Sequence, residues 1–158
     1  MRLRAASRQH TGFSLIELIS VLVILGIVSA IAASRFFDYG SFEARGFYDQ
    51  AAALVRYGQK VAIAQHRNVF VNANVVNGTI CLTYAADLGC AGGTGVLNPA
   101  DQSWFSKTAP SGVTITTSVA LSFSALGKPS PNAPASLQIV GGGMTRTITV
   151  ERETGYVH

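Results

Sequence analysis

The chain has 158 residues, 48% of them hydrophobic, with a formal net charge of +4 and a pI near 9.4. This length and apolar content suggest one domain attached to a membrane segment rather than two domains. An excess of basic residues would suit a protein that binds nucleic acid. However, three of these residues precede a long apolar stretch: Arg2, Arg4 and Arg8. Without them, nine basic and eight acidic residues leave a net charge of only +1, so overall charge gives that interpretation little support.

Residues 13–33 form the apolar stretch, and Glu17 is its single charged residue. A helix of this length, at about 1.5 Å per residue, would extend roughly 32 Å and cross one bilayer. Thirteen of its residues are Phe, Leu, Ile or Val. The favourable free energy of inserting these side chains into a bilayer exceeds the cost of inserting one acid, which is roughly 3 kcal/mol at mid-bilayer. Because positive residues stay in the cytoplasm, the chain beyond Ala33 is expected in the periplasm, and the protein is expected to be a single-pass inner-membrane protein.

Glu17 needs a partner, because an acid in a lipid-facing helix is rare. Cleavage between Gly12 and Phe13 would create a positively charged α-amino group at Phe13, four residues before Glu17. In staggered copies of the helix, the amine of one subunit could meet the carboxylate of the next, which would offset the cost of both charges in an apolar bundle. The acid would then set the register of an assembly.

Residues 12–18, Gly-Phe-Ser-Leu-Ile-Glu-Leu, resemble the class III signal of type IV pilins and type II secretion pseudopilins. The resemblance implies cleavage by a prepilin peptidase after Gly12, N-methylation of Phe13, and a role for Glu17 in filament assembly. It also implies other pilins or pseudopilins as partners through the N-terminal helix, an inner-membrane location before assembly, and a pilus or pseudopilus filament afterwards.

Two other interpretations of the N-terminus remain open. Three arginines, the apolar residues 18–28 and Ala30-Ile31-Ala32 together match a conventional secretory signal, although such a signal has no use for Glu17. An unprocessed membrane anchor is the other alternative.

Beyond the membrane segment, no proline occurs before Pro99, so one helix is predicted from Phe13 to about His66. Its second half is amphipathic. The apolar stripe comprises Phe47, Ala51, Leu54, Gly58 and Val61, and the polar face includes Asp49, Arg56, Gln59 and Lys60.

After His66 the pattern changes to the period of two that is typical of strands. Strands are predicted at residues 69–76 and 79–84, with a type I′ turn at Asn77-Gly78 between them. Residues 85–107 are predicted to form a loop, in which Asn98-Pro99 could cap a short helix and Trp104 and Phe105 anchor the segment to the core. Further strands are predicted within residues 113–123, 136–140 and 145–151, with an edge at 156–157.

The predicted fold class is therefore α+β, with a long N-terminal helix packed on a C-terminal antiparallel β domain, as in type IV pilins. The predicted organisation comprises a leader at 1–12, a membrane or filament-core helix at 13–33, its amphipathic continuation at 34–67, and a periplasmic β domain at 68–158.

Two C-terminal segments carry a second resemblance. Residues 121–129, Leu-Ser-Phe-Ser-Ala-Leu-Gly-Lys-Pro, and the closing Glu-Thr-Gly-Tyr-Val-His are similar to the H-type minor pseudopilins of type II secretion. The closing residues look most like the minor pilin C group of mannose-sensitive haemagglutinin pili.

Cys81 and Cys90 are the only cysteines in the sequence and have no histidine near them. Structural zinc would require four ligands, and the periplasm is oxidising, so a disulfide is favoured over a metal site. Closing so short a loop would stabilise the fold by roughly 2 to 3 kcal/mol. A free buried pair is the alternative.

No residues in the chain are predicted to be catalytic, and no metal or cofactor is expected. There is no Gly-x-Ser-x-Gly motif, and neither His66 nor His158 has a sequence partner that specifies catalysis. Glu151 and Glu153 share one face of a strand end, where an exposed polar edge is commoner than an acid and base pair. The sequence thus predicts a non-enzymatic structural subunit.

A DNA-binding minor pilin is the alternative function. Arg146 and Arg152 could contact phosphates, but Glu151 and Glu153 flank the latter and dilute its positive potential. Further cations could join them only if the fold brings them together: Arg67, Lys107 and Lys128.

Overall fold

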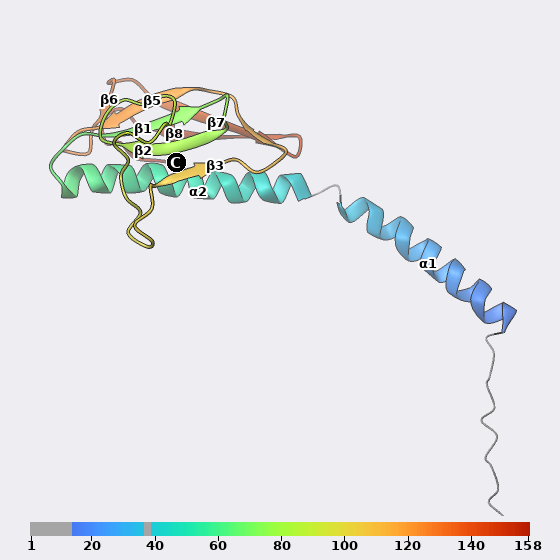
Figure 1. Ribbon diagram of the computed structural model, residues 1–158. Helices are drawn as coiled ribbons and strands as arrows, with labels where there is room; N and C mark the ends of the chain where they lie inside the picture. Colours follow the sequence, from blue (N-terminus) through green and yellow to red (C-terminus); the bar gives the residue numbers. More distant parts are fainter. Residues whose placement is uncertain (1–13, 37–38) are drawn as a thin grey trace, which may run out of the picture. The chain divides into compact units, whose positions relative to one another are not determined.

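The computed structural model describes residues 14–36 and 39–158 (Figure 1). The chain divides into two compact units, residues 1–37 and 38–158. The first contains helix α1 (Leu15–Phe36), and the second contains helix α2 (Tyr39–Ala64) with all of the strands. Each unit is described by itself.

The structure describes the predicted helical region as α1 and α2, and one continuous helix from Phe13 to about His66 stays a prediction. Phe37 and Asp38 lie outside the described residues. The membrane stretch and the amphipathic stretch are both helical, as predicted.

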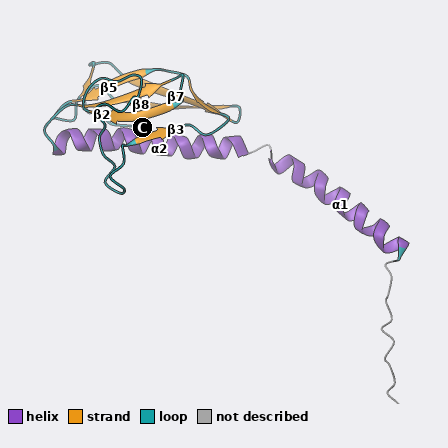
Figure 2. Ribbon diagram, in the orientation of Figure 1, coloured by secondary structure: helices purple, strands orange, loops and turns teal. Residues whose placement is uncertain are grey.

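The strands form two antiparallel sheets. One has the order β3-β2-β1-β5-β6 and the other the order β4-β7-β8. Figure 2 shows the strands along one side of α2, which packs against strands of both sheets. The strands are β1 (Val69–Asn74), β2 (Thr79–Thr83), β3 (Ser106–Thr108), β4 (Val113–Ile115), β5 (Val119–Phe123), β6 (Pro129–Ser130), β7 (Ala135–Gly141) and β8 (Met144–Val150).

The predicted apolar stripe of α2 is buried. Phe47, Leu54 and Val61 all face the core, with Ala51 and Gly58 between them. Gly58 allows a close approach, since a Cβ there would lie 2.8 Å from the Cδ2 atom of buried Leu82. The stripe thus fixes which side of α2 meets the sheets.

The predicted polar face of α2 is only partly solvent-facing. Asp49 and Lys60 are exposed, but Arg56 donates to the carbonyl of Val157 at 3.2 Å. Gln59 Nε2 donates to the carbonyls of Gly127 and Thr154, both at 2.9 Å. These two side chains join α2 to segments far away in the sequence.

The β1–β2 hairpin is present, but its predicted type I′ turn is wrong. The last strand pair is Asn74 with Thr79, so four residues form the turn. Of Asn77 and Gly78 only Gly78 has a positive φ, 60°, whereas type I′ needs both. Instead, the Asn74 side chain accepts hydrogen bonds from the N–H groups of Val76 and Asn77, which makes an Asx-type turn.

The long loop between β2 and β3 is anchored as predicted. Trp104 Nε1 donates to the Leu82 carbonyl at 3.0 Å, and the Phe105 ring packs edge-on against Tyr57 with 4.9 Å between centroids. Asn98 does not cap a helix: its side chain accepts from the Ala100 N–H and closes a turn. The Gln102 N–H donates to the Asn98 carbonyl at 2.9 Å, but Gln102 has a positive φ of 57°, which is not helical.

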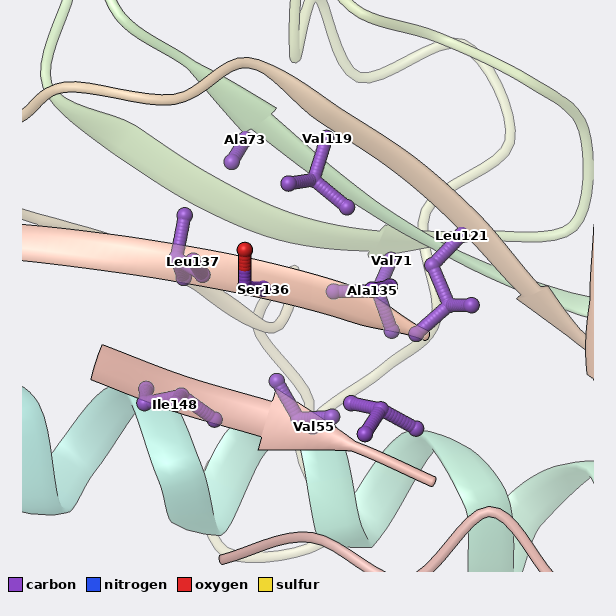
Figure 3. A pocket seen from close by; sticks show the side chains of 10 residues that line it. Val55, Val71, Ala73, Val119, Leu121, Ala135, Ser136, Leu137 and Ile148 are labelled. Atoms are coloured by element: carbon purple, nitrogen blue, oxygen red, sulfur yellow. The ribbon is translucent and has the colours of Figure 1, made fainter. Parts of the chain in front are cut away.

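The stretch 113–123 forms two short strands, β4 and β5, which belong to different sheets. The segment at 156–157 adds an edge as predicted, through a bridge between Val150 and Val157. The core between the sheets and α2 contains an apolar cavity of about 10 Å³ (Figure 3). Val55 of α2, Ile148 of β8 and Leu121 of β5 are among its lining residues.

Candidate functional site

Helix α1 is the first candidate functional element. Its side chains from Leu15 to Ile31 are exposed within the described structure, and Leu15–Ala32 is long and apolar enough to cross a membrane. In water, exposure of so many aliphatic side chains is strongly unfavourable. The helix therefore requires a lipid environment or other apolar helices around it.

Glu17 lies in the first turn of α1. The Ser14 carbonyl accepts from the N–H groups of Glu17 and Leu18, which starts the helix, and the Ser20 hydroxyl donates to the Glu17 carbonyl at 2.9 Å. Within residues 14–36 and 39–158, no hydrogen bond or ion pair involves the Glu17 carboxylate. The negative charge suits the positive end of the helix dipole but remains available to a further partner.

Gly12 and Phe13, the predicted cleavage and methylation residues, lie outside the described residues. Their assignment remains a prediction from the sequence.

The disulfide loop is the second candidate element. Cys81 on β2 and Cys90 form a disulfide with an S–S distance of 2.03 Å and a Cα–Cα distance of 5.9 Å. The Asp87 carboxylate accepts from the N–H groups of Ala91 and Gly92, at 2.8 and 3.3 Å. The loop is thus held both by the disulfide and by the hydrogen bonds to the Asp87 side chain.

A buried polar pair supports the same loop. Asn72 Nδ2 donates to the Thr83 hydroxyl at 2.7 Å, and both residues are fully buried. The Asn72 side-chain oxygen also accepts from the Asp87 N–H at 3.2 Å. Sequence analysis missed this role of Asn72; the only signal was an asparagine inside an apolar strand.

The titratable residues of the β domain make ordinary surface contacts. Glu151 lies 3.2 Å from His158, and Glu153 contacts Arg152 and Lys128 at 3.4 and 4.0 Å. Hydrogen bonds from Ser103 to the carboxylate lower the pKa of exposed Asp101. Glu151 therefore faces an imidazole and Glu153 faces two cations, so the two carboxylates do not form an acid and base pair.

The cations considered for DNA binding have separate surroundings. Lys128 and Arg152 share the carboxylate of Glu153, and the Arg67 guanidinium lies 3.8 Å above the Tyr84 ring. Lys107 belongs to β3 at the edge of the larger sheet, whereas Arg146 belongs to β8 of the smaller one. None of these contacts favours a phosphate-binding surface.

The core cavity offers no ligand site. Its volume is about 10 Å³, whereas small-molecule sites usually enclose roughly 300 to 1,000 Å³. Nine of its ten lining residues are Val, Leu, Ile or Ala, with Ser136 the exception. In the part of the chain that the structure describes, no cluster of three or more His, Cys, Asp or Glu residues could hold a metal ion.

Residues 7–33 match the family described as the prokaryotic N-terminal methylation motif. A curated relative, the type IV narrow pilus major component PilA5 of Thermus thermophilus, is 41% identical over 58 residues. That match covers 37% of this chain, and the chain spans about half the length of the relative.

The fold of the larger part of the chain also has solved counterparts. The type IV minor pilin FimU of Pseudomonas aeruginosa, in one crystal form, shares a TM-score of 0.53 at 17% identity, over 75% of this chain and 88% of FimU. A second crystal form of FimU gives a TM-score of 0.51 at 16% identity, over 75% and 90%.

The chain thus combines a prokaryotic N-terminal methylation motif at residues 7–33 with an exposed apolar helix and the fold of the type IV minor pilin FimU.

Proposed function

We propose that the chain is a minor pilin or pseudopilin, a structural subunit that joins a filament through α1. The filament is either a type IV pilus, such as one of the mannose-sensitive haemagglutinin type, or a type II secretion pseudopilus. Prepilin peptidase would cleave after Gly12 and methylate Phe13, and other pilins or pseudopilins would surround the processed helix.

One observation carries the proposal: α1 is apolar on all sides and its only charged residue before Arg35 is Glu17, whose carboxylate has no partner in the described structure. An assembly of such helices would cover the aliphatic side chains. A liberated amine at Phe13 of a neighbouring copy would supply the missing charge for Glu17.

Before assembly, α1 would anchor the protein in the inner membrane, with the β domain in the periplasm. Three arginines before residue 13 favour this orientation, and the disulfide between Cys81 and Cys90 fits an oxidising compartment.

The N-terminal mass of the protein purified from membranes tests the proposal. We expect a mature chain that begins at N-methylated Phe13 in cells with an active prepilin peptidase, and an intact leader in cells without it. A mature chain that begins at Met1, or after residue 32, would reject the proposal. The first result would favour an unprocessed anchor and the second a secretory signal.

A further inference from the structure

The turn between β1 and β2 places an exposed asparagine directly before a glycine. Asn77 is exposed, and Gly78 has a φ of 60°. In residues 14–36 and 39–158, which the structure describes, no hydrogen bond involves the Asn77 side chain or the Gly78 N–H. The side-chain carbonyl carbon of Asn77 and the backbone nitrogen of Gly78 are therefore both available for reaction.

These two groups are the reactants of asparagine deamidation. The Gly78 nitrogen loses its proton to a solvent base and attacks the side-chain carbonyl carbon of Asn77. The new C–N bond closes a succinimide ring, and the side-chain nitrogen leaves as ammonia. Water then opens the ring at either carbonyl, which gives aspartate or isoaspartate. Asparagine is a thermolabile residue for this reason, and glycine, which lacks a Cβ, leaves the attacking nitrogen unshielded and conformationally free.

Hydrogen bonds hold the side chains of two neighbouring asparagines. Asn72 is fully buried, and its side chain donates to the Thr83 hydroxyl at 2.7 Å and accepts from the Asp87 N–H at 3.2 Å. The Asn74 side chain accepts from two backbone N–H groups of the turn and donates to the Gly89 carbonyl at 3.2 Å. Neither side chain can turn toward its following backbone nitrogen without the loss of these bonds.

At the remaining asparagines, the nitrogen of the following residue is the obstacle: Asn68, Asn98 and Asn132. Val69, which follows the first, is fully buried, and Pro99, which follows the second, has no N–H. The N–H of Ala133, which follows the third, already donates to a backbone carbonyl at 2.7 Å. Among the asparagines of the described chain, Asn77 alone combines an unheld side chain with an unbonded glycine N–H.

We propose that Asn77 is a site of spontaneous deamidation in the folded protein, with water as the only co-reactant. The reaction goes beyond filament assembly and needs neither processing at Gly12 nor insertion of α1. Because no enzyme sets its rate, the modified fraction rises with the age of the subunit. Without the three arginines before residue 13, nine basic residues would then face nine acidic residues instead of eight, so the net charge would change from +1 to 0.

Isoaspartate also changes the backbone of the turn, because the chain then passes through the former side chain and gains one methylene group. The Asn77 N–H donates to Asn74 Oδ1 at 3.1 Å, and the Gly78 carbonyl accepts from the Ala109 N–H at 2.8 Å. A longer backbone cannot keep both bonds. Five residue pairs still join β1 to β2, and the disulfide holds Cys81. The change should therefore be confined to the turn and to the segment at Ala109.

Mass spectrometry of the full chain in detergent micelles tests the proposal. The protein, with its disulfide intact, is kept in mildly alkaline buffer made with heavy-oxygen water, then returned to ordinary water and digested in acid. We expect the peptide that contains Asn77 to gain heavy oxygen and to separate into an aspartate and an isoaspartate form. The peptide that contains Asn132 is the internal control and should stay unchanged. Amide hydrogen exchange at Ala109 should be faster in the isoaspartate fraction.

Two variants separate the chemistry from its consequences. Asn77→Gln keeps the backbone bonds of the turn, but its longer side chain closes a less favourable ring, so the heavy-oxygen gain should be lost. Freshly prepared Asn77→Asp adds the charge without the extra methylene and should leave exchange at Ala109 as in the natural chain. Heavy oxygen at Asn77 in the urea-unfolded chain but not in the folded chain would overturn the proposal, as would equal incorporation at Asn132.

Discussion

At the scale of single residues, Glu17 and the cysteine pair illustrate two uses of a side chain. The disulfide is complete within the described structure, and Asp87, Asn72 and the β2 backbone surround it. Glu17 lies on an exposed apolar helix, where its charge has no partner within the described residues. The cysteine pair therefore stabilises the fold, while our proposal assigns Glu17 to filament assembly.

Replacement of Glu17 by alanine tests the assembly role. Glu17→Ala should leave membrane insertion and leader cleavage intact, because it makes an inserting helix more apolar, but should block incorporation into filaments. The measurements are the N-terminal mass and the amount of subunit in sheared filaments. Ser20→Ala is the matched control, since the Ser20 hydroxyl bonds only to the Glu17 carbonyl within α1. Normal incorporation of Glu17→Ala would contradict the assigned role.

Removal of the disulfide tests its contribution to stability. The double change Cys81→Ala and Cys90→Ala should lower the free energy of unfolding by roughly 2 to 3 kcal/mol, because the unfolded chain regains the freedom of the closed loop. Urea denaturation of the oxidised chain and the double variant measures the difference. Reduction of the natural protein with dithiothreitol should give a similar loss. A loss well under about 1 kcal/mol would show that Asp87 and Asn72 hold the loop without the disulfide.

At the scale of elements, two of the three glycines of α2, Gly46 and Gly58, have opposite surroundings. A Cβ at Gly46 would have no neighbouring atom within 4 Å, whereas one at Gly58 would meet Leu82 at 2.8 Å and Val71 at 3.4 Å. Both neighbours are buried strand residues, so they have little room to move. A substitution at Gly46 therefore reports the effect of helix propensity on stability, and the same substitution at Gly58 reports the added effect of core packing.

The same substitution at the two glycines should change stability in opposite directions. Gly46→Ala should raise the free energy of unfolding by up to about 1 kcal/mol through helix propensity alone. Gly58→Ala gains the same propensity but adds an atom to a filled core, which typically costs about 1 to 3 kcal/mol, so it should be destabilising. Chemical denaturation of both variants under one set of conditions is the measurement. A stabilising Gly58→Ala would mean that α2 does not need its close approach to β2.

Sequence patterns predicted the elements better than their connections. The stripe from Phe47 to Val61 and the alternation in β7 and the second half of β8 follow from burial on one face, which a periodic pattern records directly. The Asn77-Gly78 turn failed because a competing local interaction, the Asn74 side chain, sets a four-residue turn.

The candidate site was predictable to a similar degree. Local sequence placed Glu17 in the first turn of an apolar helix and favoured the disulfide. Gln59 was assigned to the polar face, and its bonds to Gly127 and Thr154 could not be inferred, because both partners are distant in sequence.

At the scale of the whole molecule, the two units differ in what they need in order to be stable. The unit of residues 38–158 contains the buried core, both sheets and the disulfide. Among the described residues of the first unit, 14–36, none belongs to that core, and helix α1 exposes aliphatic side chains along its length. The larger unit should therefore fold in water, while α1 should require lipid, detergent or neighbouring subunits.

A fragment of residues 39–158, expressed in an oxidising compartment, tests this division. We expect it to be soluble, to give a cooperative urea transition, and to match the free energy of unfolding of the β domain in the full chain in detergent within about 1 kcal/mol, because no core contact is removed. The full chain without detergent should aggregate, since α1 then exposes its apolar surface to water. As a control, the fragment with Phe47→Ala should lose about 3 to 5 kcal/mol, because Phe47 anchors α2 in the core. A fragment that binds hydrophobic dyes and unfolds without cooperativity would instead show that α1 is required for the fold of the β domain.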